Sequence, residues 1–149
     1  MSEYLAPSQG TLRYSPKLLG DRTSDKWWLV ADCDPEIGKY YRHLFWLSTH
    51  KAYRPWRPAW HEHITVIRNE EPLHKECWEK YAGQPIDFWY NPLPETNGCY
   101  WWLNVQCDRL LEIREELGLP KEPQIPLHLS FCHVGNDDGN FEHQNPGPG

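Results

Sequence analysis

The chain has 149 residues, 39% of them hydrophobic, and its 21 acidic and 15 basic side chains give a net charge of −6. This length predicts one domain with its own core, and no apolar run approaches the roughly 18 residues that span a bilayer. An acidic chain can bind the phosphates of long nucleic acid only through a local basic patch, so the charge favours a small phosphorylated substrate.

The cysteines and the N-terminus indicate a cellular compartment. Five cysteines without a Cys-x-x-Cys pair indicate reduced thiols rather than a disulfide framework or a zinc site. The first residues lack both the basic and the apolar regions of a signal peptide. We therefore expect a cytoplasmic location and no membrane partner. We also expect a single domain over residues 1–149, with a flexible tail from about residue 137.

In the first half of the chain we expect a short strand at Thr11–Tyr14 and a stronger one at Lys26–Cys33. Asp34 and Pro35 then begin a helix that runs to about Leu47, because aspartate caps helices and proline suits the first position. The apolar stripe of this helix, expected to face the core, comprises Ile37, Tyr40, Tyr41, Leu44 and Phe45.

The rest of the chain alternates between strands and helices. Apolar alternation predicts strands at His61–Arg68, Ile86–Tyr90, Tyr100–Cys107 and Leu127–Val134. Helices are expected near Leu73–Tyr81 and from Asp108 to Leu117. The order strand, helix, strand thus occurs in each half. It predicts an α+β fold of two pseudo-symmetric lobes, each with a mainly antiparallel sheet flanked by helices, across a central cleft.

Two of these strands carry the same pattern of histidine, apolar, hydroxyl and apolar residues, H-I-T-V from His63 and H-L-S-F from His128. Residues two apart in a strand share a face, so Thr65 lies beside the first histidine and Ser130 beside the second. A single copy would indicate only a histidine at a sheet surface. If the two strands are adjacent, one cleft holds two imidazoles and two hydroxyls, which can transfer protons and bind a phosphoryl group without a metal or cofactor.

Other residues are weaker candidates. Two aromatic rings could stack on a base and two polar side chains could reach a substrate from loops; these are Tyr14, Trp60, Arg57 and Gln124. Core packing or a solvated loop explains such residues equally simply. His61 shares a face with His63 and could support it, or bind a metal together with His128. A metal-free site is favoured, because no third ligand occurs at a typical spacing.

The paired H-x-[ST]-x strands resemble those of the 2H phosphoesterase superfamily, whose fold is bilobal with both motifs lining a central cleft. Over about residues 11–135, the stretches H-I-T-V-I-R-N-E-E-P, W-E-K-Y-A-G-Q-P-I-D-F, Y-W-W-L-N-V-Q-C-D-R-L-L-E-I-R-E-E-L-G-L-P and P-L-H-L-S-F are similar to the phage anti-CBASS protein 1 family. Members of that family are phage nucleases that destroy the cyclic di- and trinucleotide signals of bacterial immunity. One departure is Ser130, where threonine is expected.

The resemblance implies a metal-independent phosphodiesterase that hydrolyses 3′–5′ bonds of cyclic nucleotides such as 3′,3′-cGAMP in the host cytoplasm, to counter CBASS defence. His63 and His128 would be the general acid and base, in either order, and Thr65 and Ser130 would donate hydrogen bonds to the phosphate. No cofactor is expected, and the protein would be a monomer or a weak homodimer. The alternatives are an RNA 2′,3′-cyclic phosphodiesterase and a non-catalytic protein that sequesters cyclic nucleotides.

Overall fold

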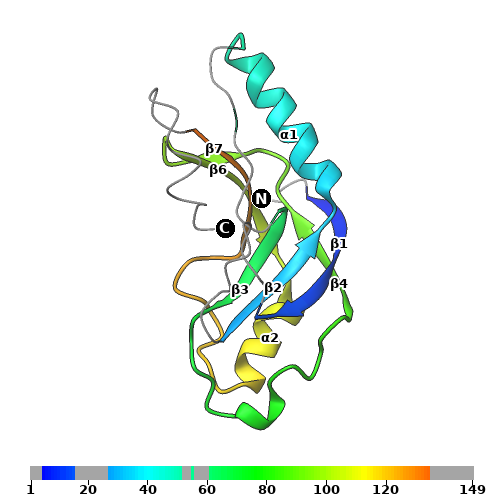
Figure 1. The fold of residues 1–149 in the computed structure, drawn as a ribbon, viewed down its shortest axis with the longest axis vertical. Helices are drawn as coiled ribbons and strands as arrows, with labels where there is room; N and C mark the ends of the chain where they lie inside the picture. The colour runs from blue at the N-terminus through cyan, green and yellow to red at the C-terminus, as the bar shows by residue number, and fades with distance from the viewer. Residues whose placement is uncertain (1–4, 16–26, 52–54, 56–60, 135–149) are drawn as a thin grey trace.

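The computed structural model describes residues 5–15, 27–51, 55 and 61–134 (Figure 1). The elements within these residues are β1 (Ala6–Tyr14), β2 (Trp28–Cys33), α1 (Pro35–Ser48), β3 (His63–Arg68), the 3-10 turn η1 (Lys75–Cys77), β4 (Pro85–Tyr90), β5 (Glu95–Thr96), β6 (Tyr100–Gln106), α2 (Asp108–Glu116) and β7 (His128–His133). The strands therefore outnumber the α-helices in the described part of the chain.

Six strands close into an antiparallel barrel in the order β4-β1-β2-β3-β7-β6, and pairing between β4 and β6 completes the ring. The short strand β5 pairs only with β6 and lies outside the ring. Two seams of the barrel are short. β3 and β7 pair at Ile64 and Leu129, and β4 pairs with β6 at two positions, Trp89 with Gln106 and Tyr90 with Val105.

The predicted fold class, a bilobal α+β arrangement of two sheets around a central cleft, is wrong. The order strand, helix, strand does occur in each half, as β2–α1–β3 and β6–α2–β7. However, β3 pairs directly with β7, and β1 pairs with both β2 and β4. Since β4 also pairs with β6, all strands belong to one sheet and the two halves share one barrel and one core.

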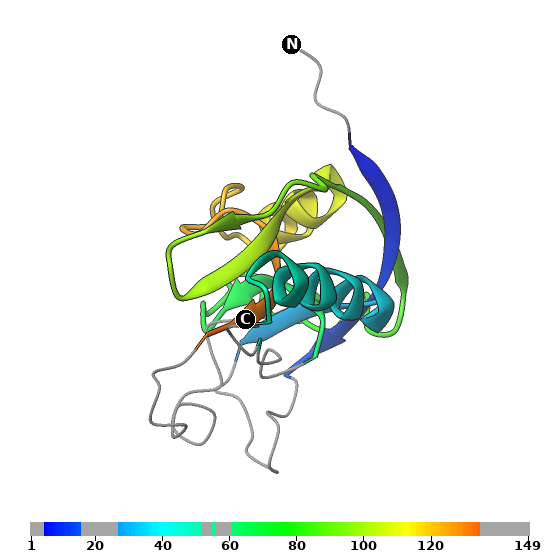
Figure 2. The same cartoon turned by 90° about the horizontal axis from the view of Figure 1, so that it is seen from above.

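The core fills the barrel and continues to α2. Fully buried aliphatic side chains from four different strands meet there; they are Leu29, Ile64, Leu103 and Leu129. The predicted apolar face of α2 is buried, as Leu110, Ile113 and Leu117 show. α1 and α2 lie toward opposite ends of the long axis of the molecule in Figure 1, and in the view from above in Figure 2 the helix α1 lies in front of the strands.

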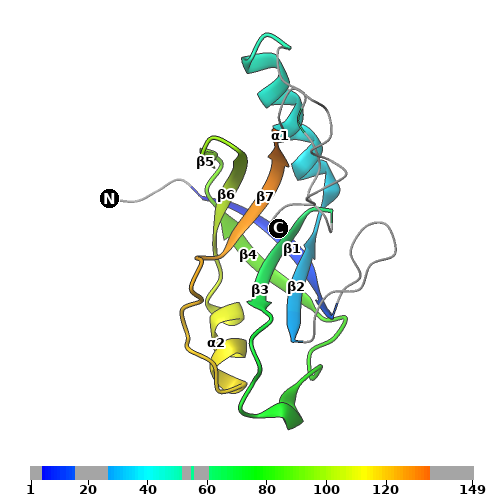
Figure 3. The same cartoon turned by 60° about the vertical axis from the view of Figure 1, so that its left-hand side comes forward.

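The predicted start of α1 is confirmed, because the Asp34 carboxylate accepts a hydrogen bond from the Glu36 amide at 2.9 Å and Pro35 follows the cap. Its predicted stripe is only partly buried. Tyr41 and Phe45 pack into the core, but Tyr40 is 59% exposed and Leu44 is 40% exposed. The reason is that α1 packs along β7 on one side and extends beyond the barrel, so the neighbouring residues of the stripe face outward (Figure 3).

Three further differences concern local structure. β1 is longer than the predicted strand Thr11–Tyr14, because it pairs with neighbours on both sides. The helix predicted near Leu73–Tyr81 is wrong: only the turn η1 forms, Leu73 is exposed, and Glu79 has a positive φ of 67°, which a right-handed helix does not contain. β5 was not predicted. Among the described residues, no helix is both long and apolar enough to cross a bilayer.

Candidate functional site

The two histidine motifs lie side by side in the barrel wall. β3 and β7 are antiparallel neighbours, and the second residues of the two motifs pair with each other. Extending this register by one residue each way places His63 beside Ser130 and Thr65 beside His128. Residues directly opposite on such strands have Cβ atoms roughly 5 Å apart, and diagonal pairs are roughly 7–8 Å apart. The two imidazoles and the two hydroxyls therefore share one face, diagonally arranged.

The two histidines of this face differ in exposure, although both hydroxyl residues, Thr65 and Ser130, are buried. His63 is fully buried and Thr65 nearly so, whereas His128 is partly exposed and borders a cavity together with Ser130. The hydroxyl oxygen of Thr65 has no hydrogen-bond partner in the part of the chain that the structure describes. A buried hydroxyl left without a partner costs about 1–3 kcal/mol, so such a group is expected to have a role, such as binding a ligand.

Each imidazole is oriented by the backbone carbonyl two residues before it. Nδ1 of His63 lies 2.8 Å from the carbonyl oxygen of His61, and Nδ1 of His128 lies 2.8 Å from that of Pro126. A carbonyl oxygen can only accept, so each Nδ1 carries a hydrogen and donates it. Nε2 is therefore the atom of each ring that can exchange a proton with a ligand.

Burial gives His63 a low proton affinity. Removal from water lowers the pKa of His63 to about 4, and the positive charges of His128 and Arg68 act in the same direction. The bond to the His61 carbonyl and the carboxylate of Asp32 oppose this shift. His63 is therefore neutral near pH 7 and carries a lone pair on Nε2, as a general base requires.

This low pKa predicts a loss of stability in acid. The unfolded chain binds a proton at this residue near pH 6.5, whereas the folded chain binds it only near pH 4, so the free energy of unfolding falls between these values. We expect His63 alone to remove about 3 kcal/mol between pH 7 and pH 4. Urea unfolding at both pH values measures the effect. The wild type should lose that much more than His63→Gln, and equal losses would contradict a neutral buried ring.

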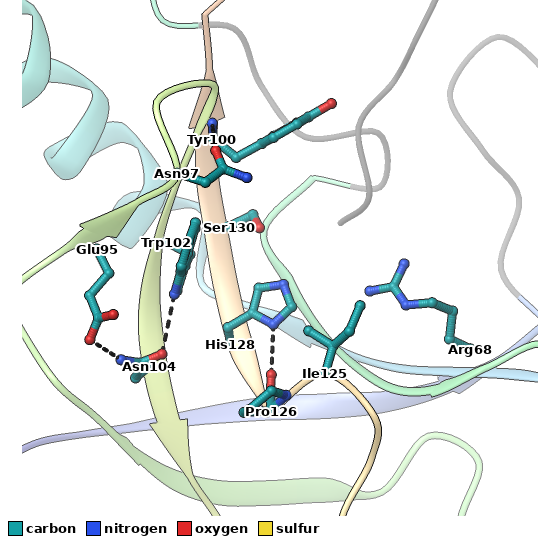
Figure 4. A pocket seen from close by; sticks show the side chains of 10 residues that line it. All are labelled: Arg68, Glu95, Asn97, Tyr100, Trp102, Asn104, Ile125, Pro126, His128 and Ser130. Carbon is teal, nitrogen blue, oxygen red and sulfur yellow. Dashed lines mark hydrogen bonds between the residues drawn. The ribbon is translucent and has the colours of Figure 1, made fainter.

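A cavity of about 350 Å³ opens beside His128 and Ser130 (Figure 4). Tyr100 and Trp102 line it from one face of β6, and Ile125 lines it from the segment that precedes β7. The ring centroids of Trp102 and His128 are 6.2 Å apart in an edge-to-face arrangement. Aromatic side chains next to a proton-transferring group suit the binding of a nucleobase close to its phosphate.

Polar side chains line two sides of the cavity. The indole Nε1 of Trp102 donates to Asn104 at 3.2 Å, and the amide of Asn104 donates to Glu95 at 2.5 Å, which fixes one wall. Arg68 lies across the cavity from that wall (Figure 4), with its guanidinium 5.4 Å from the centroid of the Trp28 ring. A permanently charged guanidinium at this place can offset the charge of a phosphate.

Sequence reasoning missed Arg68, Tyr100 and Trp102. The two aromatic residues alternate on one strand, and this alternation was the available signal for them. Arg68 had no such signal, because strict alternation puts it on the face opposite to Thr65. The register between β2 and β3 leaves Val66 without a partner, and this β-bulge returns Arg68 to the motif face.

Of the four weaker candidates, the two that the structure describes, Tyr14 and Gln124, do not line the cavity. Tyr14 is buried, and its ring packs edge-on against Trp78 with the centroids 4.8 Å apart, which favours the core-packing alternative. Gln124 is exposed and precedes the lining residues without lining the cavity. Trp60 and Arg57 lie outside the described residues.

The metal-binding alternative gains no support from the described residues. Among them, no group of three or more histidine, cysteine, aspartate and glutamate side chains is arranged to hold a metal ion. His61 is exposed, and its carbonyl oxygen is the atom that contacts His63. The residues present on the motif face suit proton transfer and hydrogen bonding to an anion.

Comparison with known proteins does not assign this site. No protein-family model matches the chain, no curated protein is significantly similar to it, and no solved structure matches it. The similarity of the motif stretches to the phage anti-CBASS protein 1 family therefore stays a prediction.

Proposed function

We propose that the chain is a metal-independent phosphodiesterase that cleaves 3′–5′ bonds of cyclic di- and trinucleotides and so counters the immune signals made by CBASS systems. The observation that carries the reaction type is the diagonal pair of imidazoles, His63 and His128, each beside a hydroxyl on one face of β3 and β7. His128 and Ser130 line an aromatic cavity, and His63 is buried behind them. The narrower substrate class rests on the sequence resemblance alone.

In the proposed reaction the ribose 2′-hydroxyl is the nucleophile. Nε2 of the neutral His63 takes its proton while the oxygen attacks the adjacent phosphorus. The bond from phosphorus to the 5′-oxygen breaks, and His128 gives that oxygen a proton, which leaves a 2′,3′-cyclic phosphate. Water then opens the cyclic phosphate with the histidine roles exchanged. Because His63 is buried, substrate binding must open a path to its Nε2.

The neighbouring groups would stabilise the charge of the transition state. Thr65 and Ser130 would donate hydrogen bonds to the non-bridging oxygens, where negative charge increases. Arg68 would offset the remaining charge from the other side of the cavity. The volume of about 350 Å³ is near the lower end for ligand pockets, roughly 300–1,000 Å³, so it suits one nucleotide unit with its base against Tyr100 or Trp102.

A direct assay distinguishes this function from the alternatives. The protein is incubated in EDTA with 3′,3′-cGAMP, with its analogue that lacks both 2′-hydroxyls, and with an RNA that ends in a 2′,3′-cyclic phosphate, and the products are separated by chromatography. We expect cleavage of 3′,3′-cGAMP and none of the deoxy analogue, because the analogue lacks the nucleophile.

Each other outcome has a definite meaning. Cleavage of the RNA end alone would favour the RNA phosphodiesterase, and tight binding of 3′,3′-cGAMP without products would favour sequestration. Efficient cleavage of the deoxy analogue would indicate water as the nucleophile. Activity that EDTA abolishes and a divalent cation restores would contradict the metal-independent mechanism.

A further inference from the structure

Both motif strands contain a β-bulge at the same position, the residue after the hydroxyl. On β3 the register with β2 passes from Thr65 to Ile67 and leaves Val66 without a partner. On β7 the register with β6 passes from Ser130 to Cys132 and leaves Phe131 without a partner. A bulge interrupts the ladder of backbone hydrogen bonds and bends the strand, so each bulge needs another contact that fixes its backbone.

An arginine from the helix of the opposite half makes this contact at each bulge. Nη1 of Arg42, on α1, donates to the carbonyl oxygen of Phe131 at 2.9 Å. Nη1 of Arg114, on α2, donates to the carbonyl oxygen of Val66 at 2.8 Å. α1 follows β2 and reaches the second motif, whereas α2 follows β6 and reaches the first. The helix of each half therefore contacts the motif strand of the other half, and these two contacts link the halves of the barrel.

Each arginine is also held by a carboxylate. Arg42 pairs with Glu62 at 2.9 Å, and Arg114 pairs with Glu70 at 2.6 Å. The Glu62 side chain is completely buried and packs so closely on Gly38 of α1 that a methyl group there would collide with the carboxylate. Neither carboxylate oxygen of Glu62 has a hydrogen bond among the described residues, so the ion pair with Arg42 is what compensates its buried charge. The pair is therefore a specific structural contact rather than a surface ion pair.

Arg42 contacts both motif strands, β3 and β7, where the pairing between them is shortest. It binds Glu62, the residue before His63, and the carbonyl of Phe131, the residue after Ser130. Between these two contacts, β3 and β7 pair at a single position. The guanidinium therefore acts as a second connection between the motif strands and fixes how far the first histidine lies from the second hydroxyl.

We propose that Arg42 and Arg114 are positioning residues of the catalytic face, each holding the bulge that aims one histidine–hydroxyl pair. Neither arginine lines the cavity, so neither is expected to touch the substrate. The catalytic consequence rests on the function proposed above, whereas the structural consequence, a fixed arrangement of β3 against β7, does not.

The test uses the full chain with Arg42→Met combined with Glu62→Gln, because the single change would leave a buried unpaired carboxylate. Lys39→Met is the matched control, since Lys39 lies on the same helix in an exposed ion pair with Glu36. In the double variant we expect kcat for 3′,3′-cGAMP to fall at least about 30-fold with KM within threefold, and the β7 amides near Ser130 to exchange with deuterium at least about tenfold faster. Arg42→Lys keeps one donor, so its kcat and its exchange rate should lie between those of the double variant and those of the control Lys39→Met.

The outcomes separate this inference from the proposed function. If the wild-type protein left every cyclic nucleotide intact, the proposed function would be wrong. The deuterium exchange rates by themselves would then decide whether Arg42 positions β7. A double variant with wild-type exchange at β7, or with wild-type kcat, would overturn the positioning role. A rise in KM with unchanged kcat would also overturn it, because that result indicates direct contact with the substrate.

Discussion

Replacing His128 by alanine is expected to reduce the turnover of 3′,3′-cGAMP at least about 1,000-fold, because a general acid or base contributes roughly 10²–10⁴-fold to the rate. The side chain is partly exposed at the cavity, so its removal should leave the barrel folded. For the buried His63 the better variant is His63→Gln, which fills most of the space and cannot act as the base. We expect a similar loss from it. Single-turnover kinetics measure the loss, and thermal unfolding checks the fold.

His74→Ala is the matched control, since this histidine is exposed and lies outside the motif strands. It should keep wild-type kcat. If either motif variant retained more than about a tenth of wild-type turnover, that histidine would have no place in the mechanism. The double variant should be at most a few-fold slower than the slower of the two single variants. The reason is that the effects of residues that act as one catalytic unit do not add.

The shared face of the histidine and the hydroxyl within each motif could be predicted from the sequence, because it follows from local rules, whereas the adjacency of the two motif strands entered only as a condition. Alternation puts the histidine and the hydroxyl of each motif on one face, and the apolar residues between them, Ile64 and Leu129, must face the core. The structure places both at zero exposure and pairs them with each other. The helix start at Asp34 was also predictable, since the cap and the proline after it are chemically specific.

The closure of the barrel could not be predicted in this way. It depends on β1 pairing with both β2 and β4, and on β4 pairing with β6 through Trp89 and Tyr90. These strands are far apart in the chain and have similar apolar patterns, so their sequences do not determine which strand pairs with which. The same strand–helix–strand order therefore fits two lobes or one barrel, and only the long-range pairing decides between them.

The bulges explain why alternation failed inside the motif strands. Strict alternation along β7 would put His133 on the face opposite to His128, but Phe131 has no register partner and shifts the alternation, so His133 pairs with Tyr100 at the wall of the cavity. The two rings lie 5.6 Å apart. Arg68 is displaced in the same way on β3. Each bulge leaves two consecutive buried apolar residues, Val66–Ile67 and Phe131–Cys132, and a regular buried strand contains such short apolar runs too, so hydrophobic periodicity does not identify the bulge.

Replacing Arg114 by methionine is expected to lower the free energy of unfolding by about 3–5 kcal/mol, the usual cost of removing one partner of a buried ion pair. Arg114 is only 2% exposed. Its guanidinium donates to the carbonyl oxygens of Pro120 and Val66 and pairs with Glu70. Methionine fills similar space but supplies no donor, so two carbonyls and a carboxylate lose their partner at once. Urea unfolding at pH 7 measures the change.

Arg109→Met is the control on the same helix. Arg109 is exposed, lies over the Tyr81 ring and contacts Glu112 only at 3.4 Å, so its loss should cost less than about 1 kcal/mol. Adding Glu70→Gln to Arg114→Met should recover part of the stability, because it removes the uncompensated charge but not the unsatisfied carbonyl of Val66 at the bulge. A loss below about 1 kcal/mol for Arg114→Met would mean that the bulge is held by the strand pairing itself, since the ion pair would then contribute no more than a surface contact.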